Sequence, residues 1–296
     1  MVNSVTFAII TIKPKQMPFK ELFDETLDIN STEKYELAVQ LSPANVTFCI
    51  LDTIRNKYIL LRLFEADDND YFTASELDDI MHKDDFLNCR YKKVTFVIPT
   101  KKSTLVPIQL YDPGKKDEYF NLNHLHESNA AIFANKITDP EAYTVFEVSK
   151  SINDAITSRY LNITLVHHLK PLLNHAYRAG KSFKDDYIHL HVEKDFFNLI
   201  IINTNKLKFC NSFTYRNIND ILYYVMNVLK NFEINQETTI HLSGFVERYD
   251  DLTSVFSAYV SQLKFSQLSG NFTFSYVFNE SVLHHYINLF NLSNCV

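Results

Sequence analysis

A strand–turn–strand pattern that occurs twice constrains the fold of this chain more than any other feature. Residues 50–60 read ILDTIRNKYIL, which is an apolar run, a polar turn and a second apolar run. Residues 200–209 repeat the pattern as IIINTNKLKF, and Asn203 stands at the position of Asp52. Apolar runs of this length around a polar turn are typical of β-hairpins. Because a predicted helix follows each hairpin, we interpret the two copies as an internal duplication of one α/β unit.

The first half of the chain places strands before and after its helix. Three successive strands are predicted from their alternating or continuous apolar residues, at 34–41, 46–52 and 57–64. Residues 75–88 have helical spacing, and Ser75 is the expected N-cap. The segment KKVTFVIPT at 92–100 predicts a buried strand. A further helix is expected over 165–180, with Gly180 as its C-cap.

The second half repeats this order and extends it. Three strands are predicted at 186–193, 196–203 and 206–215, followed by a helix over 217–232 that Asn217 or Asn219 caps. The remaining elements alternate as a strand at 238–244, a helix at 249–263, a strand at 271–278 and a helix at 280–290.

This order of elements predicts the fold class. Three antiparallel strands followed by alternating helices and strands are the order of a ribonuclease-H-like unit, with a mixed sheet flanked by helices. We expect two such units, residues 1–182 and 183–296, to face each other in an actin-like α/β architecture. The segment 100–145 has weak periodicity and gives no firm prediction.

The net charge indicates which partners are unfavourable, and the cysteines indicate the redox compartment. The net charge is −6 and the sequence pI is about 6.0, which disfavours nucleic acid as the main partner. The four cysteines are isolated and form no CxxC pair, so a reducing, cytoplasmic compartment is expected. No apolar run is long enough to span a membrane, and we interpret the apolar N-terminal stretch, residues 1–15, as a strand.

Several short blocks of the sequence also resemble a known family. The blocks are NSF-Y (Asn211, Ser212, Phe213 and Tyr215), D-LYY (Asp220, Leu222, Tyr223 and Tyr224) and LSG (Leu242, Ser243 and Gly244). Together with the stretch LSPANVTFCILDTIRNKYILL, they resemble an uncharacterised bacterial family, the domain of unknown function 3822, over roughly residues 35 to 290. The resemblance implies a duplicated actin-like fold, similar to pilus-assembly and secretion-system members of that superfamily. It implies no activity.

The actin-like resemblance directs attention to a nucleotide cleft. In active members of the superfamily, the first hairpin of each half grips phosphate through glycine-rich turns, and a nearby acid holds hydrated Mg²⁺. The residues at the expected positions are Asp52, Thr53, Asn203, Thr204, Ser243 and Gly244. Neither hairpin turn contains glycine, and the second has lost its acid. We therefore expect Asp52 to be a turn former that accepts backbone N–H bonds, and Gly244 to make a strand-to-helix turn.

Two other kinds of site are weaker hypotheses. A ribonuclease-H-like nuclease would combine Asp52 with Asp78 or Asp79 around two Mg²⁺ ions, but no third acid is placed. Three histidines on predicted strands, His189, His191 and His241, could form a metal site, yet they fit better as polar positions on a partly exposed sheet. The adjacent pairs His167–His168 and His284–His285 are expected on helices, with diverging side chains.

The sequence thus favours a non-catalytic protein, a degenerate actin-like ATPase without a cofactor or metal. It would act in the cytoplasm as a scaffold or regulator through a protein partner, with no role for nucleic acid. The first alternative is a Mg-ATP-binding switch or weak ATPase with divergent phosphate loops around Thr53, Thr204 and Gly244. The second is a metal-dependent phosphodiesterase that uses Asp52.

Overall fold

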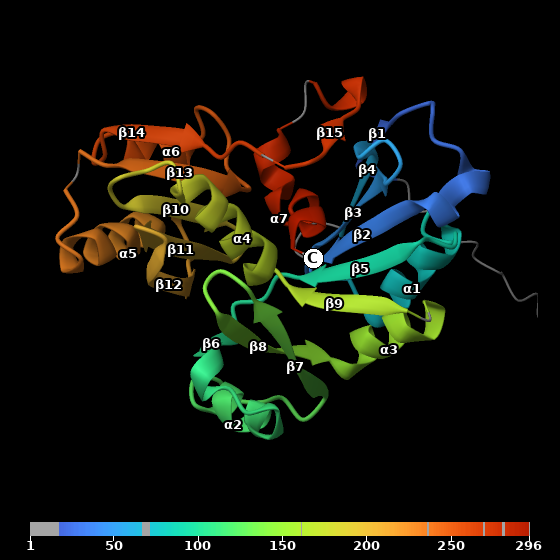
Figure 1. Ribbon diagram of the computed structural model, residues 1–296, viewed down its shortest axis with the longest axis horizontal. Coiled ribbons are helices and arrows are strands. Elements are labelled where there is room, and N and C mark those ends of the chain that lie inside the picture. The colour runs from blue at the N-terminus through green and yellow to red at the C-terminus, as the bar shows by residue number, and fades with distance from the viewer. Residues whose placement is uncertain are drawn as a thin grey trace, which may run out of the picture.

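A computed structural model describes residues 18–66, 72–160, 162–235, 237–268, 270–279 and 282–295. The N-terminal strand predicted for residues 1–15 lies outside this range. Two large sheets lie at opposite ends of the molecule, and a small third sheet lies below the space between them (Figure 1).

The first large sheet contains seven strands, of which five form the predicted unit. These are β2 (Tyr35–Leu41), β3 (Asn45–Asp52), β4 (Lys57–Glu65), β5 (Lys93–Ile98) and β9 (Ile163–His167). The order is β1-β4-β3-β2-β5-β9, with β1 (Lys20–Phe23) at the edge and β15 (Thr273–Phe274) also paired with β4. Strands β2, β3 and β4 are antiparallel neighbours, whereas β5 and β9 continue the sheet in parallel with β2.

The second large sheet has the same topology. Its strands are β10 (Tyr187–Val192), β11 (Phe196–Asn203), β12 (Lys206–Thr214), β13 (Thr239–Gly244) and β14 (Gln262–Phe265). They lie in the order β12-β11-β10-β13-β14, with an antiparallel meander followed by two parallel strands. The order β4-β3-β2-β5-β9 of the first sheet is the same arrangement, so the predicted ribonuclease-H-like architecture is confirmed in both halves.

Helices bury one face of each sheet. The first core contains the apolar side of α1 (Ala74–Lys83) and α3 (Lys150–Arg159), and the second contains that of α5 (Ile218–Asn231) and α6 (Asp251–Phe256). The opposite face of the second sheet packs against α4 (Leu169–Gly180). The remaining elements of the middle region are β6 (Ser103–Pro107), α2 (Lys116–Asn121), β7 (Ala130–Ile137) and β8 (Ala142–Ser149), which form the third sheet and its helix.

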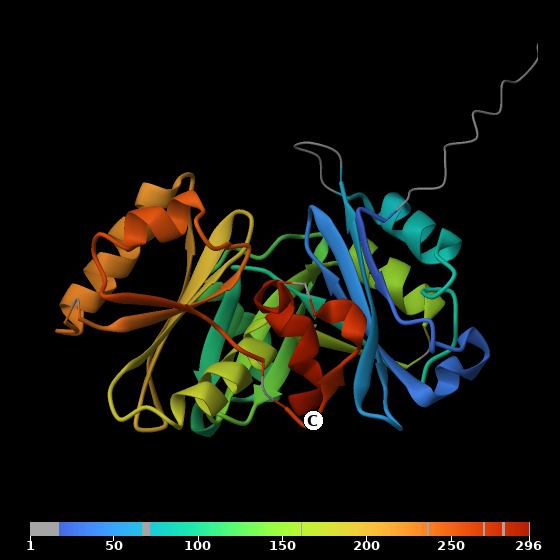
Figure 2. The ribbon, with the colours of Figure 1, turned by 90° about the horizontal axis from the view of Figure 1, so that it is seen from above.

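The C-terminal segment leaves the second sheet and returns to the first. It includes α7 (Ile287–Phe290), which lies between the two large sheets in both views (Figures 1 and 2). The Tyr58 hydroxyl of β4 donates a hydrogen bond to the Phe290 carbonyl at 2.9 Å. Aromatic rings of the C-terminal segment pack around these groups, namely Phe272, Phe274, Phe278 and Phe290. The segment therefore completes the hydrophobic core of the first sheet.

Three predictions for the C-terminal third were wrong. The helix predicted at 249–263 ends at Phe256, and residues 262–265 form β14 instead. Of the strand predicted at 271–278, only Thr273 and Phe274 are extended, and they pair with the first sheet. The helix predicted at 280–290 consists of a 3-10 turn over Leu283–Tyr286 followed by the short α7. The apolar residues of this third serve two different cores, which no single period describes.

The helix ends show where local chemistry was predictable. Asn217 caps α5 in a capping box with Asp220, as expected. Thr73 rather than Ser75 caps α1, because its hydroxyl accepts from the Glu76 N–H. The helix predicted over 165–180 begins only at Leu169, since its first residues complete β9.

Candidate functional site

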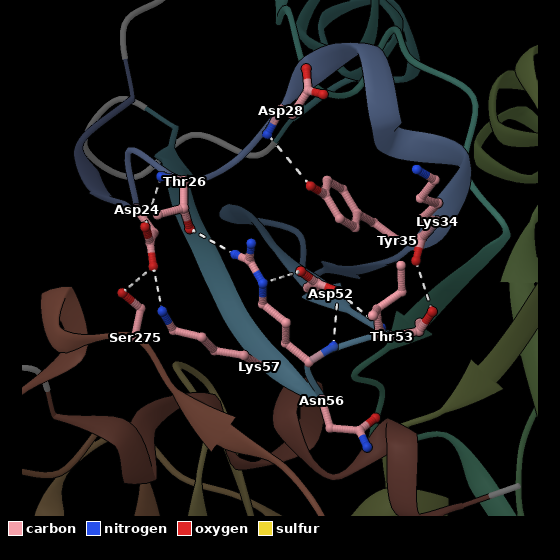
Figure 3. Close-up of polar contacts among 12 residues, drawn as sticks. Asp24, Thr26, Asp28, Lys34, Tyr35, Asp52, Thr53, Asn56, Lys57 and Ser275 are labelled. Atoms are coloured by element: carbon pink, nitrogen blue, oxygen red, sulfur yellow. Dashed lines mark hydrogen bonds and ion pairs between the residues drawn. The ribbon is translucent and has the colours of Figure 1, made fainter.

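Asp52 organises the turn between β3 and β4 (Figure 3). Its Oδ1 accepts hydrogen bonds from the backbone N–H of Ile54 at 2.9 Å and of Arg55 at 3.1 Å. The Arg55 Nε lies 3.7 Å from the other carboxylate oxygen. The Thr53 hydroxyl donates to the Lys34 carbonyl at 2.7 Å. Asp52 is therefore a turn former, as predicted, and the Thr53 side chain ties the turn to the residue before β2.

The corresponding turn between β11 and β12 is built differently. The Asn203 amide donates to Asp186 Oδ1 at 2.8 Å, and the Thr204 hydroxyl donates to Asn203 Oδ1 at 3.0 Å. Thr204 and Asn205 have φ values of 45° and 61°, the left-handed conformation of a tight two-residue hairpin turn. This turn closes through backbone conformation, whereas the first closes around a carboxylate.

Ser243 and Gly244 lie at the end of β13. The Ser243 hydroxyl lies 2.7 Å from His189 Nε2 and 2.8 Å from His191 Nδ1. Gly244 has a φ of 82°, and a Cβ there would lie 2.0 Å from the Val192 carbonyl oxygen. Only glycine fits this position, because φ is positive and the backbone of Val192 occupies the space that a side chain would need.

The six predicted residues do not form one cleft. Asp52 pairs with Tyr35 at the start of β2, and Asn203 follows Ile202, which pairs with Tyr187 at the start of β10. Gly244 instead pairs with Val192 at the end of β10. The length of that strand, about 17 Å, separates the two ends. The strand ends that carry Asp52, Thr53, Asn203 and Thr204 therefore lie on one side of their sheets. Ser243 and Gly244 lie at the opposite strand ends.

The hairpins predicted to be the first of each half are β3–β4 and β11–β12. The meanders begin with β2 and β10, so the first hairpins are instead β2–β3 and β10–β11. Their turns are residues 42–44 in the first half and 193–195 in the second. Both turns line a single cavity of about 380 Å³, which we call the inter-hairpin cleft. A Ser-Pro turn between two apolar runs marks the first of these hairpins in the sequence, but neither turn carries a residue pattern that indicates a ligand.

The walls of the inter-hairpin cleft are largely apolar. They come from the carboxyl ends of β2 and β5, the start of β3, the end of β8 and the helices α1 and α3. The side chains include Leu41, Val46, Leu77, Ile98, Val148 and Ile152.

Charged groups at the cleft are mostly paired with each other. Lys102 Nζ lies 2.9 Å from Glu147 and 2.5 Å from Glu127. Burial alone would raise the pKa of Glu147, but the hydrogen bonds from Lys102, the Glu127 N–H and His126, together with the charge of Lys102, lower it. Lys101 of the first half lies 3.9 Å from Asp195 of the second, so an ion pair spans the cleft.

A chain of buried polar side chains leads from this cleft across the second sheet. Glu193 lines the cleft, and its Oε1 lies 3.1 Å from His191 Nε2. His191 and His189 share the Ser243 hydroxyl, and Ser266 Oγ lies 3.4 Å from His189. All five side chains are buried, so the prediction of partly exposed strand histidines was wrong for His189 and His191. Alternation identified the shared face but gave no sign that α4 and α7 would cover it.

Both adjacent histidine pairs also differ from expectation. The rings of His167 and His168 lie 4.4 Å apart at the junction of β9 and α4, and His168 bonds to Asn198 at 2.9 Å. His284 and His285 both approach the Val246 carbonyl, at 2.8 and 3.0 Å. The side chains converge because each pair lies at an irregular junction or in a 3-10 turn rather than within an α-helix.

Burial keeps several of these imidazoles neutral. Desolvation lowers the pKa of His167 and of His175 to about 3, and it lowers the pKa of His168 and His189 well below the usual value. Desolvation and then the nearby Lys264 ammonium lower the pKa of His241 to about 4. Within the described residues, no group of three or more His, Cys, Asp and Glu side chains could hold a metal ion.

The comparisons with known proteins agree with this architecture. A family model described as "Protein of unknown function (DUF3822)" matches residues 24–263, and the chain belongs to that family. A Bacteroides thetaiotaomicron VPI-5482 protein with an actin-like ATPase fold and unknown function superposes with a TM-score of 0.75 at 23% identity, covering 81% of this chain and 93% of that one. The protein therefore has an actin-like fold, as predicted.

A second solved structure is more distant. It is a PilM–PilN type IV pilus biogenesis complex, similar with a TM-score of 0.56 at 11% identity over 88% of this chain and 96% of that chain. No curated protein matches the sequence. Within the described part of the chain, no helix is both long and apolar enough to cross a membrane.

Proposed function

We propose that this protein is a non-catalytic member of the actin-like fold that acts as a scaffold or regulator through a protein partner. The observation that carries the proposal is the chemistry of the inter-hairpin cleft. Its two turns meet across an apolar cavity, where apolar side chains of a partner gain more from burial than a polyphosphate would.

Electrostatics supports the same conclusion. Four carboxylates and three lysines line the cleft, and the ion pairs above occupy two of those lysines. A triphosphate would enter a site with more acids than bases and would have to displace existing ion pairs. The carboxylates are Glu127, Glu147, Glu193 and Asp195.

The fold and composition fit this role. A protein of similar fold has been solved as part of a PilM–PilN complex, so the architecture can accommodate a protein partner. All four cysteines of this chain are unpaired, which is compatible with a reducing compartment, and we propose that the protein works in the cytoplasm.

The test of the cleft is thermal unfolding with millimolar Mg-ATP, Mg-ADP and Mg-GTP. A site saturated at 100 times its dissociation constant adds about 2.7 kcal/mol, enough to move the midpoint by a few degrees. We expect no shift. A shift that Asp195→Lys increases and Ala44→Glu abolishes would overturn the proposal in favour of a nucleotide-binding switch.

The protein partner is tested by photo-crosslinking in cells that produce the natural protein. We expect p-benzoylphenylalanine at Ile152, in the cleft wall, to yield a discrete crosslinked protein. The same residue at Leu122, which is 77% exposed and lies outside the cleft, is the matched control and should not yield that product. Identical products from both positions would contradict binding in the cleft.

A further inference from the structure

A second hollow lies along β14. This strand forms one edge of the second sheet (Figure 1). It is lined by the end of α4, by α6, by β14 itself and by the C-terminal segment, and its volume is about 1710 Å³. We call it the β14 groove. It is separate from the inter-hairpin cleft, because the two share no lining residue.

The floor of the β14 groove is an open sheet edge. Among the described residues, β14 pairs only with β13. The Ser266 N–H donates to the Leu242 carbonyl of β13 at 2.8 Å. Because successive backbone groups of a strand alternate in direction, those of Leu263 and Phe265 point away from β13 and toward the groove. Such an edge is a template for an added extended segment.

The groove carries an excess of positive charge. Arg178, Arg248 and Lys264 line it and are exposed, and none of them makes a hydrogen bond or ion pair with another described residue. Glu247 is the one acid among the described residues of the lining. This local excess of cations stands out in a chain whose net charge is −6. It complements an acidic ligand.

The groove also contains two histidine nitrogens without a hydrogen-bond partner among the described residues, and a partly exposed aromatic ring. His175 is only 2% exposed, and its Nε2 has no hydrogen-bond partner among the described residues. The Nε2 of His241 is likewise buried and unsatisfied. The ring of Phe183 packs edge-on against His241 and is 37% exposed. Unsatisfied buried nitrogens beside an exposed ring fit a ligand that has both polar and apolar side chains.

We propose that an extended, acidic segment of a partner protein adds to the free edge of β14. Its backbone pairs with Leu263 and Phe265, and its carboxylates face Arg178, Arg248 and Lys264. Apolar side chains at alternate positions pack near Phe183. This proposal rests on the proposed function, because it supplies a docking site for a protein partner. Its test is separate from that of the inter-hairpin cleft.

The experiment uses the full chain and a fluorescein-labelled peptide that alternates glutamate with valine or phenylalanine. Fluorescence anisotropy at low salt should show saturable binding. We expect Lys264→Glu to weaken it about tenfold or more, because one favourable ion pair becomes a repulsion. The matched control is Lys206→Glu on β12, which makes the same change in net charge at the opposite edge of the sheet and should leave binding unchanged.

Two altered peptides separate strand addition from simple charge attraction. A peptide with lysine in place of glutamate should not bind. A peptide that keeps its side chains but is N-methylated at every second amide should lose binding, since it cannot pair with β14. Hydrogen exchange should slow at Leu263 and Phe265 when the unmethylated peptide is present.

The proposal is overturned if the glutamate and lysine peptides bind equally, if N-methylation has no effect, or if Lys206→Glu weakens binding as much as Lys264→Glu. It is also overturned if single-stranded oligodeoxythymidine binds the groove and the peptide does not. Self-association that Lys264→Glu abolishes would make a second copy the occupant instead. A nucleotide-dependent thermal shift would refute the proposed function of the cleft but would not affect these results.

Discussion

The two large sheets share one strand order but bury chemically different faces toward the middle of the molecule. The first sheet meets the C-terminal segment with Cys49, Leu51, Tyr58 and Leu61, against a cluster of phenylalanines. The second sheet meets α4 and α7 with histidines, serine and asparagine that are equally buried. Topology therefore determines which residues face inward, but it does not determine whether those residues are apolar or hydrogen-bonded polar side chains. One half is held by apolar packing, and the other combines an apolar cluster around α4 with a buried hydrogen-bonded network.

The largest expected difference between the two halves is their loss of stability at low pH. The pKa of His167 and of His175 is lowered to about 3, so these groups stay neutral in the folded protein while the unfolded chain takes up protons below pH 6.5. The unfolded state then binds more protons, and stability falls as pH decreases from about 7. At pH 5 each such histidine removes about 2 kcal/mol. His168 and His189 add to the loss in the same direction.

Hydrogen exchange measured by mass spectrometry at pH 7 and pH 5 checks this prediction. We expect β10, α4 and the end of β9, where these histidines lie, and β13, which pairs with β10, to lose protection at pH 5, after correction for the intrinsic pH dependence of exchange. The meander of the first sheet should lose less. Earlier loss of protection in β3 and β4 would contradict the assignment of acid sensitivity to the histidine network.

The next largest effect concerns the attachment of the C-terminal segment to the first sheet. The carboxylate of Asp24 is fully buried and accepts hydrogen bonds from Lys57 Nζ at 2.8 Å and from the Ser275 hydroxyl at 2.6 Å (Figure 3). Burial would raise the pKa of Asp24, but these bonds outweigh it and hold the pKa well below the usual value. Asp24→Asn should lower the free energy of unfolding by about 3 kcal/mol, because it leaves Lys57 without its partner.

Urea unfolding at pH 7 measures this loss, and Glu25→Gln, at the exposed neighbouring acid, is the matched control. The contribution of Asp24 is present above the unfolded pKa near 3.9 and is lost as pH falls through the lowered folded pKa. It thus disappears in a more acidic window than that of the histidines. A loss as small as that of Glu25→Gln would show that the Asp24 contacts contribute little to holding the segment.

The two hairpin turns give a smaller and more local contrast. Asp52→Ala removes an acceptor of two backbone hydrogen bonds and should cost about 2 kcal/mol. Asn203→Ala should cost less than about 1 kcal/mol, because Asp186 keeps its ion pair with Lys208 and the left-handed turn remains. Chemical denaturation of the two variants measures the difference directly. Equal losses would mean that the carboxylate is not what closes the first turn.

Sequence periodicity predicted the two meanders and α5, because alternate residues of each meander face the two sides of its sheet and α5 buries a regular stripe against one core. It did not predict β14, and it predicted one helix over 280–290 where a 3-10 turn precedes the short α7, since neighbouring apolar residues of this third belong to different cores. The candidate site was less predictable than the fold. Asp52 drew attention as a lone acid between apolar runs, while the turns that do line the cleft, 42–44 and 193–195, look ordinary in sequence. Whether a strand histidine is buried depends on elements distant in the chain, such as α7, which local patterns do not report.

The smallest predicted effect is a gain in stability at the second turn. Thr204 is β-branched and has a φ of 45°, a conformation that strains any residue with a branched Cβ. Thr204→Gly should raise the free energy of unfolding by about 0.5 to 1 kcal/mol, since relief of that strain outweighs the added entropy of the unfolded chain and the loss of one exposed hydroxyl bond. The matched change in the first hairpin, Asn56→Gly at a φ of 49°, should gain less, because asparagine tolerates the left-handed region. Urea denaturation of both variants ranks the two gains. A loss of stability in Thr204→Gly would show instead that the hydroxyl bond to Asn203 contributes more than the strain costs, and the second hairpin would then depend on its side chains as the first does.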